Sequence, residues 1–124
     1  MKKQPFIIII DDDESVRRSL CRLLRSLNFE ADAFSNANEF LEILPDVMPD
    51  CLILDVRMPK VNGLNLQKEL TNRNYKIPII FITAYEDEQT SVQAMKAGAV
   101  AFIQKPFNEQ VLLEAIHAAL EQQA

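Results

Sequence analysis

Residues 6–13 read FIIIIDDD, an apolar run of strand length that passes directly into three aspartates. Four more short apolar runs follow, at residues 30–34, 51–54, 79–82 and 100–103, and each precedes a stretch with helix-like character. Regular alternation of strands and helices is typical of a parallel sheet with helices on both faces. The sequence therefore predicts an α/β fold with five strands and five helices.

The helical stretches begin and end at recognisable residues. The first is amphipathic, because one face is apolar and the other carries Arg17, Arg18, Arg22 and Arg25. Asp13 or Ser15 can cap its amino end. Asn62 and Gly63 open the third helix, and Gly98 is expected to terminate the fourth, over about 88–97. The fifth helix is expected over about 109–121.

Composition narrows the class of protein. A chain of 124 residues, 48% of them hydrophobic, can form one domain over residues 1–124, with any output domain outside it. The net charge of −5 argues against direct nucleic-acid contact. No apolar run has the length of a membrane span, and Asp11 cuts short the only candidate signal segment. We expect no membrane contact, a cytoplasmic location, and reduced packing roles for Cys21 and Cys51.

Polar side chains follow four of the five predicted strands: Asp11 and Asp12, Asp55, Thr83, and Lys105. In an open parallel sheet the functional crevice lies beyond the carboxyl ends of the strands, so these groups should converge. Clustered carboxylates repel one another unless protonated or neutralised, and an all-oxygen set suits Mg²⁺. The alternative is that the first aspartates only cap the following helix, for which one acid would suffice.

The same groups suit phosphoryl transfer. The carboxylate of Asp55 can act as a nucleophile toward phosphorus. Charge on the transferred group can be neutralised by a metal ion and by the Lys105 ammonium, while the Thr83 hydroxyl can donate a hydrogen bond to it.

Several short motifs then resemble one family. They are Ile10-Asp11-Asp12, Leu54-Asp55-Val56-Arg57-Met58-Pro59, Ile82-Thr83-Ala84, Met95-Lys96-Ala97-Gly98-Ala99 and Lys105-Pro106-Phe107. In this order and spacing they resemble the receiver domain of bacterial two-component response regulators, a CheY-like fold, and are most similar to FixJ-type receivers. The resemblance implies a flavodoxin-like, doubly wound (βα)₅ sheet with strand order 2-1-3-4-5.

The resemblance also implies roles at the acidic pocket. Asp55 would accept a phosphoryl group from a phosphohistidine on a sensor histidine kinase. Asp12 would bind Mg²⁺ directly and Asp11 through water, with Asp55 and the backbone carbonyl of Arg57 as further ligands. Lys105 would pair with the phosphoryl group, and its bond to Pro106 would be cis.

Further implied positions concern switching. Thr83 would be the switch hydroxyl and Phe102 the rotating aromatic residue, here without a hydroxyl of its own. Arg57 and Tyr85 would tune dephosphorylation, with Tyr85 shielding the phosphoryl group from water. The domain would catalyse only its own phosphorylation and dephosphorylation, and so would not be an enzyme in the metabolic sense.

The same resemblance implies partners. The surface of the fourth helix, fifth strand and fifth helix would report the phosphorylation state, by dimerising or by releasing a DNA-binding output domain that controls transcription. The arginine face of the first helix is either a solvated surface or a kinase-docking surface. His117, on the last helix, is expected to be a solvated residue with no part in phosphotransfer.

Two other readings stay open at this point. The segment from Asp11 also resembles the nucleophile motif of haloacid-dehalogenase phosphatases, in which Asp11 would be the nucleophile and Asp13 the general acid. Ser15 departs from that motif, and 124 residues are expected to leave no room for a cap domain. A receiver-like interaction module that takes no phosphate is the second, although the acceptor, the metal acids and the lysine are all present.

Overall fold

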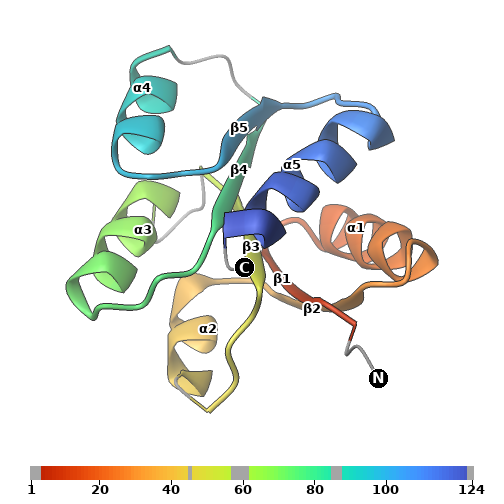
Figure 1. The fold of residues 1–124 in the computed structure, drawn as a ribbon, viewed down its shortest axis with the longest axis horizontal. Helices are drawn as coiled ribbons and strands as arrows, with labels where there is room; N and C mark the ends of the chain where they lie inside the picture. The colour runs from red at the N-terminus through yellow and green to blue at the C-terminus, as the bar shows by residue number, and fades with distance from the viewer. Residues whose placement is uncertain (1–3, 45, 57–61, 85–87, 123–124) are drawn as a thin grey trace.

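The computed structural model describes residues 4–44, 46–56, 62–84 and 88–122. Strands and helices alternate along the chain (Figure 1). The strands are β1 (Phe6–Ile10), β2 (Glu30–Phe34), β3 (Cys51–Asp55), β4 (Ile79–Thr83) and β5 (Ala101–Gln104). The helices are α1 (Glu14–Ser26), α2 (Ala37–Ile43), α3 (Gly63–Asn72), α4 (Glu88–Lys96) and α5 (Glu109–Gln122). The predicted class of fold is confirmed.

The five strands form one parallel sheet in the order β2-β1-β3-β4-β5, as predicted. β3 and β4 each extend one residue beyond their predicted ends, so Asp55 and Thr83 are the last residues of their strands, and β5 begins and ends one residue later than predicted. The reason lies in the backbone: Asp55 pairs with Ile82 and Thr83 with Gln104 in the sheet ladder. Backbone pairing continues where the apolar side-chain pattern has already stopped.

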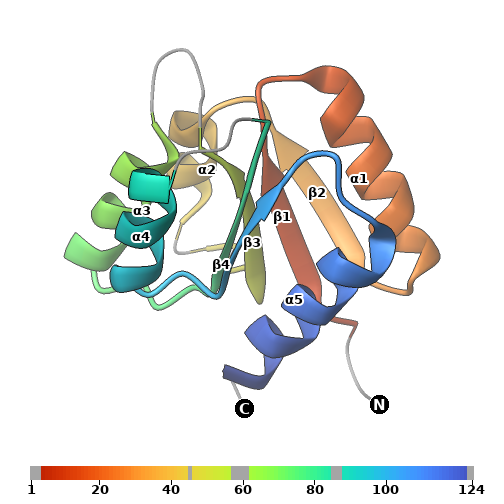
Figure 2. The ribbon, with the colours of Figure 1, turned by 90° about the horizontal axis from the view of Figure 1, so that it is seen from above.

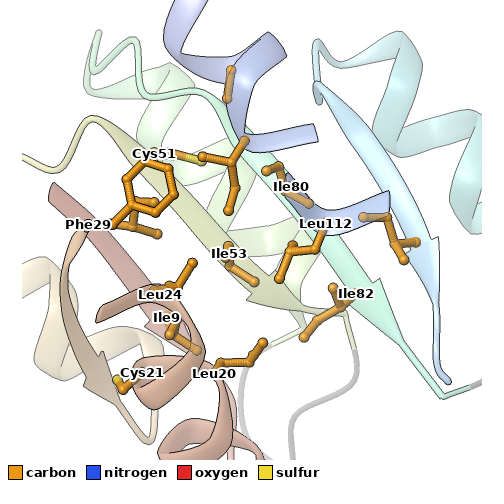
Figure 3. Close-up of a cluster of buried hydrophobic side chains, with 14 residues drawn as sticks. Ile9, Leu20, Cys21, Leu24, Phe29, Cys51, Ile53, Ile80, Ile82 and Leu112 are labelled. Carbon is orange, nitrogen blue, oxygen red and sulfur yellow. The ribbon is translucent and has the colours of Figure 1, made fainter. Parts of the chain in front are cut away.

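Helices cover both faces of the sheet, with α1 and α5 on one side and α2, α3 and α4 on the other (Figure 2). Alternate strand residues face opposite sides. Ile7 and Ile9 accordingly pack in the core beneath α1 and α5, whereas Ile8 and Ile10 pack in the core beneath the other three helices. Figure 3 shows the first core, where Leu24 of α1 and Leu112 of α5 lie over the sheet. β1 is buried on both faces, which explains its unbroken run of isoleucines.

Local signals set the ends of the helices. Asp13 is the N-cap of α1, accepting hydrogen bonds from the backbone N–H groups of Ser15 and Val16, which settles the choice between Asp13 and Ser15. Asn62 caps α3 in the same way. Gly98 follows α4 with φ of +103°, a left-handed conformation that glycine adopts without strain. Among the described residues, no helix has both the length and the apolar character needed to cross a membrane.

Candidate functional site

The predicted site residues lie at one edge of the sheet, where the strands end. Asp11 directly follows β1, Asp55 ends β3, Thr83 ends β4 and Lys105 directly follows β5. These four strands are consecutive neighbours in the sheet, and their carboxyl ends lie along the upper edge in Figure 2. The convergence expected from the sequence is therefore present.

Three carboxylates form the centre of the site. One oxygen each from Asp11, Asp12 and Asp55 lies within 4.8 Å of the others. Asp11 and Asp55 are buried, whereas Asp12 is exposed. Hard carboxylate oxygens at this spacing, open to water on the Asp12 side, fit the preference of Mg²⁺ for a few carboxylates and several retained waters. The donor set is therefore suited to a magnesium ion.

Asp11 is held by hydrogen bonds to its backbone and its side chain. Its N–H donates to the carbonyl of Phe34 in β2 at 3.2 Å, and its own carbonyl accepts from Nη1 of Arg17 at 2.8 Å. Its Oδ1 accepts from the N–H of Asp13 at 2.9 Å, and its Oδ2 lies 3.2 Å from Nζ of Lys105. A fully buried carboxylate requires such partners, because an unpaired buried charge is costly. Four contacts, two of the backbone and two of the carboxylate, thus hold Asp11 in place.

Lys105 places a positive charge beside the acids. Its Nζ pairs with Asp11, and its backbone N–H donates to the carbonyl of Thr83 at 2.7 Å. The following bond, Lys105–Pro106, is cis, as predicted. The lysine is therefore anchored at the end of β5 while its ammonium reaches the carboxylates.

Gly63, at the start of α3, allows the backbone of that helix to approach Asp55. Its N–H donates to the carbonyl of Val56 at 2.8 Å, and a Cβ at this position would lie 2.7 Å from the backbone oxygen of Asp55. Only glycine permits this approach. The sequence pattern predicts Gly63 only as the start of a helix and does not predict this close approach. The available signal was its rarity, because the chain has only two glycines.

Thr83 and Phe102 lie on neighbouring strands and on the same face of the sheet. Phe102 pairs with Phe81, two residues before Thr83, and side chains two apart share a face. The rings of Phe81 and Phe102 are 6.1 Å apart between centroids, and Phe102 is only partly buried. Thr83 is buried. Arg57 and Tyr85, the predicted tuning residues, lie outside the described residues, as does the carbonyl predicted to bind the metal.

The remaining predictions concern residues outside this edge. Cys21 and Cys51 are both free and buried, as expected. His117 is exposed on α5.

A doubly wound sheet with three acids, a hydroxyl and a lysine at its carboxyl edge defines a receiver-type signalling domain. Comparison with known proteins gives the same class: residues 7–117 match the response regulator receiver domain family. The chain belongs to that family, and its function is signalling rather than metabolic catalysis. The comparisons give no support to the phosphatase or the phosphate-independent alternative.

Individual relatives agree with this assignment. The chain is 50% identical over 116 residues to nodulation protein W of Bradyrhizobium diazoefficiens, covering 93% of this chain and 51% of that protein. It is 43% identical over 113 residues to the transcriptional regulatory protein FixJ of Rhizobium meliloti, covering 91% and 55%. The crystal structure of FixJ-N superposes with a TM-score of 0.89 at 41% identity, covering 97% of this chain and 96% of that one. The chain thus spans about half the length of these curated relatives.

Proposed function

We propose that Asp55 is the phosphoacceptor of this receiver and takes a phosphoryl group from a phosphohistidine on a sensor histidine kinase. The observation that carries the proposal is the position of Asp55 in a cluster of three carboxylates at the same sheet edge as Lys105.

In the proposed reaction a carboxylate oxygen of Asp55 attacks the phosphorus atom. The P–N bond to the histidine breaks, and the imidazole nitrogen keeps the electron pair and takes up a proton, leaving an acyl phosphate on Asp55. A Mg²⁺ ion held by Asp11, Asp12 and Asp55, with the Arg57 carbonyl, would supply neutralisation of the phosphoryl oxygens. The Lys105 ammonium and the Thr83 hydroxyl would neutralise and hydrogen-bond the same oxygens. Attack by water on the phosphorus later releases phosphate and restores the carboxylate.

We further propose that phosphorylation changes the surface formed by α4, β5 and α5, through Thr83 and Phe102. Apolar side chains are exposed there: Val92 and Met95 on α4, and Val111 on α5. Exposed apolar groups on these two helices could be covered by a partner. Homodimerisation through this face is the proposed consequence.

The proposed output lies outside this chain. The matched relatives are about twice as long, and FixJ is named as a transcriptional regulatory protein. We propose that a DNA-binding output domain outside these 124 residues carries the regulation of transcription. Two free cysteines are consistent with a reducing compartment, and we place the domain in the cytoplasm.

The test is intact mass after incubation with acetyl phosphate, with and without Mg²⁺, on the wild type, Asp55→Asn and Asp11→Asn. We expect a single phosphoryl adduct that requires Mg²⁺ and is absent in Asp55→Asn. In Asp11→Asn the adduct should still map to Asp55. An adduct that persists in Asp55→Asn, or no adduct on the wild type, would overturn the assignment.

A further inference from the structure

Arg17 connects α1 to the loop that carries two of the site's acids. Residues 11–13 link β1 to α1, and Arg17 lies in the first turns of that helix, where its N–H donates to the carbonyl of Asp13. Its side chain turns back across the loop, and Nη1 donates to the carbonyl of Asp11 at 2.8 Å. This contact is partly buried, unlike the exposed ion pair of the neighbouring Arg18 with Glu14.

The carbonyl of Asp11 belongs to the same planar peptide group as the N–H of Asp12. A hydrogen bond that fixes the direction of this carbonyl therefore also fixes the peptide plane that contains the nitrogen and the Cα of Asp12. Asp12 is the exposed member of the three carboxylates, whereas burial in the sheet edge constrains Asp11 and Asp55. The orientation of Asp12 therefore depends on its backbone more than theirs does.

We infer that Arg17 is a positioning residue for the metal site: through the Asp11–Asp12 peptide it holds the Asp12 carboxylate among the other two. The inference rests on the proposed function, because it assigns Arg17 to the binding of the cation that phosphoryl transfer uses. A guanidinium group suits this task, since it holds several donors in a fixed planar arrangement. Partners that orient metal ligands commonly affect affinity about 10–100-fold.

The test is titration of the metal-free protein with Mg²⁺ alone, followed through backbone amide NMR shifts, on the wild type, Arg17→Met, Arg17→Lys and Arg18→Met. Arg17→Met keeps the apolar stem and removes the donors, and Arg17→Lys keeps the charge and some donor capacity. Arg18→Met is the matched control, because it removes the same charge from the adjacent position without touching Asp11.

The Mg²⁺ dissociation constant is expected to rise at least about tenfold in Arg17→Met, to recover partly in Arg17→Lys and to stay near the wild-type value in Arg18→Met. Without Mg²⁺, the amide of Asp13 should exchange with solvent faster in Arg17→Met, because its hydrogen bond to Asp11 depends on the same loop. In acetyl phosphate reactions the Mg²⁺ concentration for half-maximal rate should rise, while the rate at saturating Mg²⁺ stays within about twofold.

Unchanged Mg²⁺ affinity in Arg17→Met would overturn the inference, as would an equal loss in Arg18→Met, which would indicate a general charge effect. A lower rate at saturating Mg²⁺ with an unchanged half-maximal concentration would overturn it too, since Arg17 would then act on the phosphoryl group. The proposed phosphoacceptor role fails separately, if the wild type binds Mg²⁺ but forms no adduct at Asp55. The Mg²⁺ titration still decides the role of Arg17 in that case.

Discussion

The ammonium of Lys105 lies 3.2 Å from the carboxylate of Asp11, although the two residues are 94 positions apart in sequence. Asp11 follows β1 and Lys105 follows β5, and β3 and β4 lie between those strands in the sheet. The lysine side chain therefore extends across the strand ends that carry Asp55 and Thr83. Its ammonium thus lies at the edge of the sheet that carries the three carboxylates.

Replacing Lys105 by methionine should lower stability and raise the affinity for Mg²⁺. The variant leaves a buried carboxylate without its cation, and we expect the free energy of unfolding to fall by about 1–3 kcal/mol, less than for a fully buried pair. Millimolar Mg²⁺ should restore more stability to the variant than to the wild type, because the ion replaces the missing charge. Phosphorylation at saturating Mg²⁺ should still be at least about tenfold slower.

Chemical denaturation with and without Mg²⁺ checks this prediction, with exposed Lys76→Met as control. Equal stabilisation of Lys105→Met and wild type by Mg²⁺ would contradict it.

Gly63→Ala should destabilise the protein, although alanine is the better helix former. The added Cβ would lie 2.7 Å from the backbone oxygen of Asp55 and 3.1 Å from the Cα of Val56, so the backbone must move. We expect a loss of about 1–3 kcal/mol in the free energy of unfolding, as for other overpacked sites, and slower phosphorylation because Asp55 shifts. Urea denaturation and the acetyl phosphate reaction measure the two effects. Asn65→Ala, exposed in the same helix, should be neutral or stabilising; a similarly neutral Gly63→Ala would refute the close approach.

Gln67→Leu should change the free energy of unfolding little, whereas Gln67→Glu should lower it clearly at neutral pH. The buried side chain of Gln67 in α3 donates to the carbonyl of Ala94 in α4 at 3.1 Å, and this carbonyl also accepts from the N–H of Ala99. Leucine therefore leaves no orphaned acceptor, and we expect a change within about 1 kcal/mol together with faster amide exchange in α4. Glutamate at neutral pH would place a carboxylate against a carbonyl and cost at least about 2 kcal/mol.

The pH dependence separates the two variants. Burial favours the protonated form of the introduced glutamate, so its folded pKa lies above the unfolded value of about 4.3. The protonated carboxyl can donate to Ala94, and stability should be retained below this unfolded value and lost as the pH rises through the folded pKa. Unfolding of Gln67→Glu and Gln67→Leu across acidic to neutral pH measures the difference. Parallel curves for the two variants would contradict the buried contact.

Ionisation of the Cys51 thiol should lower the free energy of unfolding as the pH rises into the alkaline range. Burial, and then the charge of Asp50, raises the pKa of its thiol from 9.0 to about 12. The folded protein thus holds this proton more tightly than the unfolded chain does, and the corresponding stability is complete below pH 9.0 and lost between there and about 12. Comparing urea denaturation at about pH 8 and about pH 10 should show a smaller loss in Cys51→Val than in the wild type.

Cys21 offers the comparison. Burial also raises the pKa of its thiol, but the guanidinium of Arg25 opposes the rise. Cys21→Val should therefore change the alkaline loss less than Cys51→Val. The reverse order would count against the assignment to Cys51.

Much of this protein was predictable from its sequence, because strands and helices leave periodic patterns. The buried run of residues 6–10 and its abrupt end at Asp11 mark a central strand and its functional end. Asp11, Asp12, Asp55, Thr83 and Lys105 each follow or end such a run, and the carboxyl ends of parallel strands necessarily share one edge. The strand order came from the family resemblance, since hydrophobic patterns alone do not specify neighbours.

Tertiary structure alone decided three contacts: the hydrogen bond of Arg17 to Asp11, the approach of Gly63 to Asp55, and the hydrogen bond of Gln67 to Ala94. In the sequence Arg17 is one of four similar arginines, and Gln67 is one amide on a polar helix. Each contact depends on the angle and depth at which a helix packs on the sheet. Packing distances of this kind follow from the combined shapes of many side chains, which no local pattern encodes.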